Sequence, residues 1–221
     1  MGRGCIILAN GRPPEIEVLR YFMATGFDSL ICADGGANSA KMLGVVPDFI
    51  VGDLDSIEPA TLEYFGGTSK VVKYKRQNDT DVEKCIKFAA KSKFTKCLIM
   101  GATGDRLDHS FCNIGITIKF MELIDIFLVS GESILEPFTG TIERECTVGE
   151  TVSIYGITRD TLFTTTGLKY RLKSEPLPFG VRESTSNIII SKKIKVSAST
   201  GAGLFIRSLQ SVKENGFFTE H

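Results

Sequence analysis

The sequence predicts an α/β protein in two parts, an N-terminal mainly parallel α/β sandwich domain followed by a C-terminal antiparallel β-sandwich domain. Up to residue 130, short apolar runs alternate with amphipathic segments of helical length, which is typical of βαβ units. Beyond residue 130 the segments are short, rich in Thr, Val and Ile, and separated by turns that contain Gly, which is typical of antiparallel strands. We therefore expect domains of residues 1–132 and 133–221.

The individual elements follow from these two patterns. The apolar runs of the first part are strand candidates, at residues 5–9, 29–33, 49–52, 70–74, 96–101 and 125–130. The amphipathic segments between them are helix candidates, at residues 14–25, 37–43, 59–65, 80–92 and 107–123. Strands of the second part are expected at residues 141–145, 150–157, 161–166, 187–190 and 193–197. Strands that alternate with helices predict a mainly parallel sheet covered on both faces. The connections in such a sheet are almost always right-handed, which limits the possible topologies.

Composition disfavours several classes of protein. Acidic and basic residues number 26 each, so there is no overall positive charge that would attract nucleic acid. No apolar stretch reaches the length of about 18 residues that a membrane span needs. The six cysteines form no CxxC pair, and we expect buried free thiols in a reducing cytoplasm; they are Cys5, Cys32, Cys85, Cys97, Cys112 and Cys146.

Polar and acidic residues follow the expected parallel strands. In an open α/β sheet, ligands bind beyond the carboxyl ends of the strands. The residues that follow those ends are Asn10, Asp34, Asp53, Asp55, Gln77, Asn78, Asp79, Asp81, Asp105 and Asp108. Carboxylates that merely face solvent would scatter over both ends of the sheet. The pattern therefore predicts an acidic ligand-binding edge.

Residues 52–56 (GDLDS) carry two aspartates one residue apart directly after an expected strand. If the strand continued, Asp53 and Asp55 would lie on one face, roughly 6–7 Å apart along the backbone. Two anions held together repel each other unless a cation lies between them. That cation is either a nearby lysine with water or a metal ion, and this segment alone leaves both open.

Several of these acids also have a purely structural explanation. Residues 80–83 (TDVE) match a capping box, in which Thr80 caps a helix and Glu83 reaches back to it. Asp105 can be the N-cap of a helix that begins at Arg106, with Asp108 favourable to the helix dipole. Asp34 precedes Gly35-Gly36 and fits a turn. Capping and ligand binding remain compatible, because a helix N-terminus serves both.

Taken together, the acids indicate a hard cation bound with a phosphate ligand. Mg²⁺ prefers oxygen ligands and is usually held by one or two carboxylates together with substrate phosphates. The Gly35-Gly36 turn leads into an expected helix whose backbone N–H groups suit an anion. Neither GxGxxG nor GxxxxGK[ST] occurs, which disfavours a dinucleotide enzyme and a P-loop kinase. A magnesium nucleotide is the ligand that fits.

Six segments together resemble the thiamine pyrophosphokinase family. In the first part these are residues 31–38 (ICADGGAN), 52–56 (GDLDS), 77–81 (QNDTD) and 101–109 (GATGDRLDH). In the second part they are residues 166–170 (TGLKY) and 184–187 (STSN). The segments come in the order of that family, and the likeness covers nearly the whole chain.

The resemblance implies a homodimer that transfers pyrophosphate from ATP to thiamine, with the active site at the subunit interface. It implies a Mg²⁺ site formed by Asp53, Asp55 and Asp81, and a position for Asp108 beside the transferring group. It further assigns residues to the nucleotide and its cleft, namely Asp34, Asn38, Gln77, Thr80 and Arg106. The residues expected to hold thiamine are Ser184, Ser186 and Asn187.

One departure from the family concerns the thiamine site. Family members often place a tryptophan just past the Ser-Asn segment, but this chain has none, and three isoleucines follow Asn187. Two other hypotheses therefore stay open, a pyrophosphokinase acting on another hydroxymethyl heterocycle such as a pterin, and a non-catalytic module that binds nucleotide or thiamine. For the transfer reaction, Asp55 or Asp108 is the expected proton acceptor.

Overall fold

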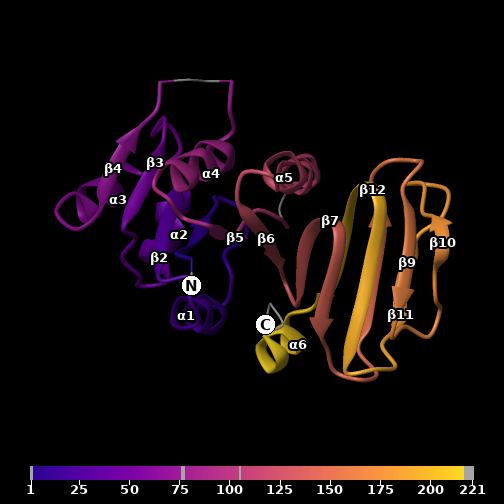
Figure 1. Ribbon diagram of the computed structural model, residues 1–221. Coiled ribbons are helices and arrows are strands. Elements are labelled where there is room, and N and C mark those ends of the chain that lie inside the picture. The colour runs from indigo at the N-terminus through magenta and orange to yellow at the C-terminus, as the bar shows by residue number, and fades with distance from the viewer. Residues whose placement is uncertain (1, 76–77, 105, 217–221) are drawn as a thin grey trace. The chain divides into compact units, whose positions relative to one another are not determined.

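The computed structural model describes residues 2–75, 78–104 and 106–216. The chain divides into two compact units, Met1–Gly131 and Glu132–His221. Figure 1 shows helices and strands alternating in the first unit, whereas the second consists of strands with one short helix near its end. Among the described residues, no helix combines the length and the apolar character that crossing a membrane requires.

The first unit is built on a parallel sheet. Its described strands are β1 (Gly4–Leu8), β2 (Ser29–Ala33), β3 (Phe49–Gly52), β4 (Lys70–Lys73), β5 (Lys96–Met100) and β6 (Asp125–Ser130). They lie in the order β6-β5-β1-β2-β3-β4, and each neighbouring pair is parallel. The chain thus moves outward from β1 to β4 and then returns to the other side of β1 with β5. This reversal creates a topological switch point between β1 and β5, where α/β sheets bind ligands.

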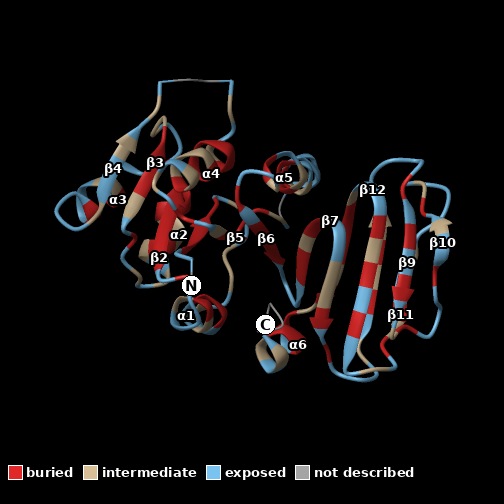
Figure 2. Cartoon of the chain, in the orientation of Figure 1, coloured by how far each residue is buried: buried red, intermediate tan, exposed pale blue. Residues whose placement is uncertain are grey.

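Helices cover this sheet. They are α1 (Ile16–Ala24), α2 (Gly36–Met42), α3 (Pro59–Phe65), α4 (Asp81–Lys91) and α5 (Leu107–Phe120). Every residue of β1 and β2 is buried (Figure 2), as expected for central strands covered on both faces. Helix α4 contacts β1, β2 and β3, and α5 contacts β6. The contacts of α4 matter for function because its first turn lies at the ligand-binding edge.

The second unit is an antiparallel arrangement around one long strand. Its elements are β7 (Ser133–Glu145), β8 (Thr151–Gly156), β9 (Leu162–Thr166), β10 (Lys173–Pro176), β11 (Ser184–Ile188), β12 (Lys193–Ser208) and α6 (Leu209–Asn215). Strand β12 pairs with β7, β8 and β9, while β10 pairs with β9 and β11 with β8. A core that includes Phe138, Phe163 and Phe205 fills the unit. The expected fold class, an α/β domain followed by an antiparallel β-sandwich, is confirmed.

Some expected elements differ in extent from the observed ones. The segments expected at residues 141–145 and 193–197 are parts of the longer strands β7 and β12, and β10 and α6 were not expected. Residues 198–203 (ASTGAG) interrupt the apolar alternation, and the pairing of β12 with β7 shifts register between Ser197 and Ala202. The strand continues beyond this irregularity, so its second half could not be recognised from period-2 patterning.

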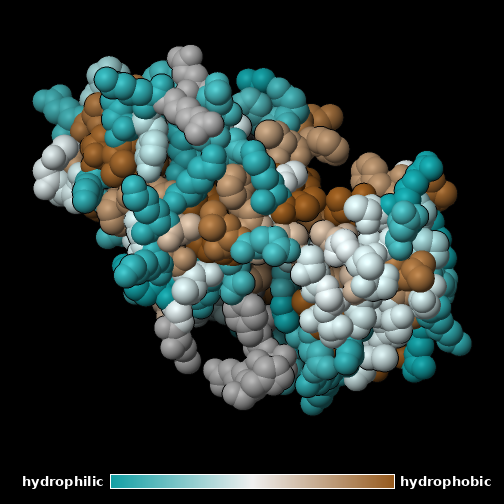
Figure 3. Space-filling model, turned by 45° about the horizontal axis from the view of Figure 1, so that its top comes forward, coloured by the Kyte–Doolittle hydropathy of each residue, from teal (hydrophilic) through white to brown (hydrophobic). Residues whose placement is uncertain are grey.

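The face seen in Figure 3 carries both hydrophilic and apolar side chains. Large exposed apolar residues include Leu107 and Phe111 on α5 and Phe179 and Val181 in the second unit. Five of the six free cysteines are buried as expected, whereas Cys112 is exposed. Burial raises the pKa of the Cys5 thiol to about 12, which keeps this group protonated and unreactive at neutral pH.

Candidate active site at the carboxyl edge of the parallel sheet

A cavity of about 550 Å³ opens in the first unit beyond the carboxyl ends of β1 and β5. This is the topological switch point, and the volume lies within the usual range of ligand pockets, about 300–1,000 Å³. Of the expected site residues, Thr80, Asp81 and Arg106 line the cavity. Asn10 and Asn113 also line it, so the walls offer amide, hydroxyl, carboxylate and guanidinium groups to a polar ligand.

Close backbone packing forms the floor of this cavity. The N–H of Gly11 donates to the carbonyl of Gly101 at 2.7 Å, and a Cβ on Gly11 would lie only 2.6 Å from that oxygen. A Cβ on Gly36 would lie 2.1 Å from the carbonyl oxygen of Leu8. Larger residues at these two positions would therefore force the β1 and β5 loops and the start of α2 apart.

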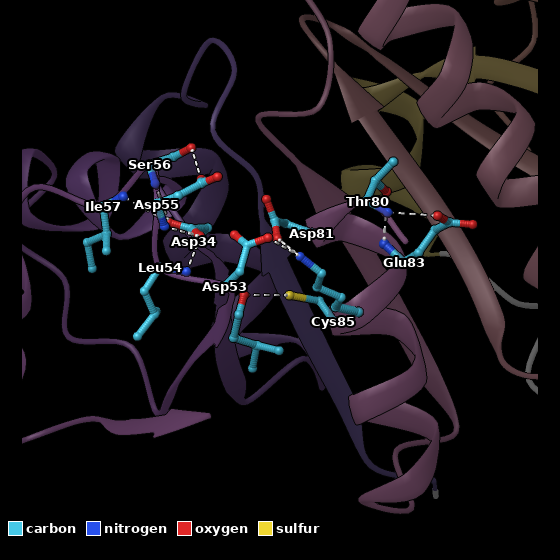
Figure 4. A network of polar contacts seen from close by, with 12 residues as sticks. Asp34, Asp53, Leu54, Asp55, Ser56, Ile57, Thr80, Asp81, Glu83 and Cys85 are labelled. Carbon is cyan, nitrogen blue, oxygen red and sulfur yellow. Dashed lines mark hydrogen bonds and ion pairs between the residues drawn. The ribbon is translucent and has the colours of Figure 1, made fainter. Parts of the chain in front are cut away.

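Asp34 anchors the loop that follows β3. Its side chain is buried, with the residue only 1% exposed, and its backbone has a φ of 45°. Its carboxylate accepts four backbone N–H groups, shown by dashed lines in Figure 4, from Leu54 (2.6 Å), Asp55 (3.2 Å), Ser56 (3.1 Å) and Ile57 (2.8 Å). Burial raises the pKa of the Asp34 carboxyl, and these N–H groups act in the opposite direction. The role that the structure gives Asp34 is to fix the loop.

The loop does not continue the strand, which corrects one expectation. Strand β3 ends at Gly52, and Leu54 has a φ of 68°, so the alternation expected to put Asp53 and Asp55 on one face does not apply. The Asp53 carboxylate turns toward α4, whereas Asp55 is exposed and accepts a hydrogen bond from the Ser56 hydroxyl at 2.8 Å. The four N–H bonds to Asp34 impose this bend in place of an extended strand.

Three carboxylates converge between the loop and α4. Asp34, Asp53 and Asp81 each present an oxygen atom, and these atoms lie within 4.8 Å of one another. Lys84, one helical turn after Asp81, places its Nζ 3.0 Å from Asp53 Oδ2 and 2.8 Å from Asp81 Oδ1. Its side chain is 3% exposed. Lys84 therefore supplies a cation for Asp53 and Asp81, whereas Asp55, the other aspartate of the expected pair, is not part of this group. A metal ion remains compatible with the Asp34, Asp53 and Asp81 group.

The charges in this group set the protonation states. The hydrogen bond from Lys84 lowers the pKa of Asp53 below its ordinary value. For Lys84 itself, burial favours the neutral amine, but the bonds to Asp81 and Asp53 outweigh burial and raise its pKa. Asp53 Oδ1 is buried and has no hydrogen-bond partner among the described residues. A buried carboxylate oxygen without a donor, beside further carboxylates, is the kind of ligand atom that Mg²⁺ prefers.

The N-terminus of α4 is capped as expected. The N–H of Glu83 donates to Thr80 Oγ1 at 3.2 Å, and the N–H of Thr80 donates to Glu83 Oε2 at 2.9 Å (Figure 4). Both halves of the capping box are present, and Lys119 also contacts the Glu83 carboxylate. The box fixes the first turn of α4 against the cavity, so that the helix dipole favours a negatively charged ligand there.

At the start of α5, Arg106 and Asp108 form an exposed ion pair. Arg106 Nη2 lies 2.5 Å from Asp108 Oδ2, and Nε donates to Oδ1 at 3.1 Å. The Arg106 hydrogen bond lowers the pKa of Asp108 to about 2. Asp108 is not part of the Asp34, Asp53 and Asp81 group. Arg106 begins the helix without a side-chain cap, while Asp105 and the nucleotide candidate Gln77 lie outside the described residues.

Two expected site residues make internal contacts. Asn38 bridges the end of the GDLDS loop, where its amide donates to the Ser56 carbonyl at 3.2 Å and accepts from the N–H of Glu58 at 3.1 Å. In the second unit, Asn187 accepts from the N–H groups of Tyr170 and Ile188. Its amide donates to the Tyr170 carbonyl and to Ser184 Oγ. Both asparagines thus hold loops in place.

The neighbours of Asn187 differ from it in exposure. Ser184 lies at the start of β11, and exposed Ser186 has a φ of 52° at the irregular pairing of β11 with β8. Asn187 is buried, so the short STSN segment presents its serines more openly than its asparagine. Two consecutive exposed residues, Thr185 and Ser186, replace the alternation of a regular strand, at the position where the pairing of β11 with β8 shifts register.

Sequence reasoning missed Lys84 and Asn113 as residues of this site, whereas Asn10 was among the residues expected at the ligand-binding edge and lines the cavity. Lys84 follows Asp81 by three positions, a spacing that places both on one side of a helix. That signal was present but is indistinguishable from an ordinary exposed ion pair. Asn113 lies in the middle of α5, where its amide donates to the Ala102 carbonyl at 2.7 Å, and no local pattern distinguishes it.

Comparison with known proteins gives matches to both parts of the chain. The family model "Thiamin pyrophosphokinase, catalytic domain" matches residues 23–128, and "Thiamin pyrophosphokinase, vitamin B1 binding domain" matches residues 139–204. Thiamine pyrophosphokinase 3 of Oryza sativa is 32% identical over 203 residues, which cover 79% of this chain and 76% of that protein. Thiamin pyrophosphokinase 1 of Caenorhabditis elegans is 26% identical, over 89% of this chain and 85% of that protein.

Solved structures share the fold. Thiamine pyrophosphokinase from Bacillus subtilis superposes with a TM-score of 0.80 at 23% identity, covering 93% of this chain and 99% of that chain. The enzyme from Geobacillus thermodenitrificans gives a TM-score of 0.78 at 26% identity, covering 92% and 96% of the two chains. Both parts of the sequence are thus matched, by family models and by fold. The chain belongs to the thiamine pyrophosphokinase family of enzymes.

Proposed function

We propose that this protein transfers the terminal pyrophosphate of ATP to the hydroxyethyl oxygen of thiamine in a Mg²⁺-dependent reaction that yields thiamine diphosphate and AMP. The observation that carries the proposal is the convergence of Asp53 and Asp81 beside a polar cavity at the topological switch point. Asp81 belongs to both features, so a ligand in the cavity would lie next to the carboxylates. Transfer of this kind depends mainly on alignment and charge neutralisation.

Asp53 and Asp81 are the residues that would hold Mg²⁺, through carboxylate oxygens such as the unpartnered Asp53 Oδ1. When bound, the metal neutralises phosphate charge and orients the phosphorus atom that is attacked. Asp34 would support the metal site indirectly, because its carboxylate fixes the loop that carries Asp53 and Asp55. Asp55, exposed on the same loop, is proposed as a further ligand reached from the cavity side.

The nucleotide phosphates would be bound by groups that line the cavity. Thr80 and the N–H groups of the first turn of α4 offer hydrogen bonds and a favourable dipole. Arg106 offers a guanidinium. Asn38 would support this wall through its bonds to the GDLDS loop. Gln77 stays a candidate for the same role outside the described residues.

Asp55 and Asp108 remain the two candidates for accepting the proton of the thiamine hydroxyl. The ion pair with Arg106 holds the pKa of Asp108 at about 2, which makes this carboxylate a weak base while the pair is intact. If Arg106 turned to the phosphates, Asp108 would regain basicity. The Asp55 carboxylate, in contrast, accepts a hydrogen bond from a neutral donor, the Ser56 hydroxyl.

The second part of the chain would bind thiamine. We assign the catalytic role to residues 1–132 and thiamine binding to residues 133–221, with Ser184 and Ser186 as contacts and Asn187 holding the Tyr170 loop. The match of residues 139–204 to a vitamin B1 binding domain supports this division. The proposal also includes a homodimer with the active site at the subunit interface. It further includes a cytoplasmic location, which suits the free thiols.

The test is an assay of purified protein with ATP, Mg²⁺ and thiamine that follows AMP and thiamine diphosphate together. We expect equal amounts of both products, and none when EDTA removes the metal. AMP formation with a pterin alcohol but not with thiamine would preserve the reaction and replace the acceptor. Absence of turnover with every acceptor, in folded protein, would assign the chain a binding role.

A further inference from the structure

The buried ammonium group of Lys84 already occupies one side of the carboxylate group. Its Nζ contacts Asp53 Oδ2 and Asp81 Oδ1, at 3.0 and 2.8 Å, from a side chain that is 3% exposed. With all three carboxylates ionised, Asp34, Asp53 and Asp81 together with this ammonium sum to a formal charge of −2. Among the described residues, Lys84 is thus a cation already bound to these carboxylates. A metal ion that binds here must share the carboxylates with Lys84.

We infer that Lys84 weakens the affinity of the site for a free divalent cation, so that the metal is taken up together with the nucleotide. This inference rests on the proposed function and adds an order of binding to it. A metal ion that approaches the nucleotide-free site meets two carboxylates, those of Asp53 and Asp81, that both already bind the single ammonium group of Lys84. The metal and Lys84 compete to neutralise the same charges, and their repulsion opposes simultaneous binding.

The positions of the remaining oxygen atoms explain why a nucleotide would reverse this effect. Lys84 binds one oxygen of Asp53, and the other, Oδ1, is the atom without a partner. Asp34 contributes charge, but its oxygens already accept four N–H groups. Lys84 and the loop N–H groups thus already bind most of the described carboxylate oxygens of the Asp34, Asp53 and Asp81 group. Phosphates in the adjoining cavity would add oxygen ligands and negative charge, which offset the repulsion from Lys84.

The expected effect is large because the groups are close and partly buried. A unit charge a few ångströms from a divalent ion, in an effective dielectric of about 20, changes binding by well over tenfold. Rearrangement of the aspartates after loss of Lys84 would reduce this change. We therefore expect Lys84→Met to tighten binding of a free divalent ion by at least about tenfold.

The experiment titrates nucleotide-free protein with Mn²⁺ and follows the free ion by electron paramagnetic resonance. The matched control is Lys87→Met, on the same helix, because Lys87 pairs with Asp79 at 2.8 Å and is outside the carboxylate group. Lys84→Met should bind Mn²⁺ at least about tenfold more tightly than wild type, and Lys87→Met within about twofold. Unchanged or weaker binding by Lys84→Met would overturn the inference.

A second variant separates charge from hydrogen bonding. Lys84→Gln keeps a donor toward the aspartates but removes the charge, so it should also bind free Mn²⁺ more tightly than wild type. If Lys84→Gln bound free Mn²⁺ with wild-type affinity while Lys84→Met bound it more tightly, the role of the lysine charge would be contradicted. If both variants stay unfolded by circular dichroism at every Mn²⁺ concentration, Lys84 is a structural residue and the inference fails.

The same titration with a non-hydrolysable ATP analogue distinguishes this inference from the proposed function. Wild-type protein should bind Mn²⁺ much more tightly with the analogue than without it, and Lys84→Met should show a smaller gain. If the wild type binds no Mn²⁺ even with the analogue, the proposed function itself is wrong. Equal gains in wild type and Lys84→Met would reject only the role of Lys84.

Discussion

Replacing Asp34 by asparagine should destabilise the protein although it changes one oxygen atom to an amide nitrogen. The carboxylate accepts two N–H groups on each oxygen, from Leu54 and Asp55 on Oδ2 and from Ser56 and Ile57 on Oδ1. Asparagine keeps one acceptor oxygen and turns an NH₂ group toward the other two N–H groups. Two donors, which are partly or fully buried, thereby lose their acceptor and face another donor.

The magnitude follows from these two lost bonds. A buried donor left without an acceptor costs about 1–3 kcal/mol, so two cost about 2–6 kcal/mol. Removing a negative charge from beside Asp53 and Asp81 offsets part of this cost. We expect a net loss of about 2–5 kcal/mol in the free energy of unfolding at pH 7, a large share of the stability of an ordinary domain.

Urea unfolding followed by circular dichroism measures this loss. The matched control is Asp55→Asn, because Asp55 lies in the same loop but is exposed, with its carboxylate bonded to the Ser56 hydroxyl. The control should stay within about 0.5 kcal/mol of wild type. If Asp34→Asn also stays within about 0.5 kcal/mol, the four N–H bonds do not hold the loop, and Asp34 is not its anchor.

Two further predictions concern the helices at the cavity. Thr80→Ala removes the acceptor for the Glu83 N–H and should lower the free energy of unfolding by about 0.5–2 kcal/mol. Urea unfolding measures this change, and an unchanged free energy of unfolding would mean that the cap does not stabilise the helix. Because Arg106 depresses the folded-state pKa of Asp108, their ion pair should stabilise the protein above the ordinary pKa of 3.8 and lose this effect as the pH falls toward about 2. An NMR titration of Asp108 should therefore show a midpoint near pH 2 that moves toward 3.8 in Arg106→Gln, and a wild-type midpoint near 3.8 would mean that the pair does not persist in solution.

Much of the fold follows from local patterns. Apart from β4, which has a lysine at each end, the parallel strands of the first unit are short and mostly apolar. All five helices expected in this unit appear, with ends shifted by no more than a few residues. The capping box at Thr80 was recognised because both of its bonds join residues three positions apart. Such features need no knowledge of distant segments. Of the long strand β12, only the first five of 16 residues were recognised, because its Ser, Thr and Gly residues break the alternation.

The candidate site depended more on tertiary structure. Acids that follow parallel strands were expected to meet at one edge, and Asp34, Asp53 and Asp81 do so. The role of Asp34 was not foreseen, because its partners lie 20 to 23 residues further along the chain. A lysine on an amphipathic helix is ordinarily solvated, so the burial of Lys84 required the structure.

The central claim is that Asp53 and Asp81 hold the metal ion for pyrophosphate transfer. The most direct measurement is the rate of AMP formation with ATP, Mg²⁺ and thiamine for Asp53→Asn and Asp81→Asn, at matched folded fractions. Each variant should lose at least about 100-fold in kcat, because the charge-neutralising metal is no longer positioned. Rates within about threefold of wild type in both variants would contradict the claim.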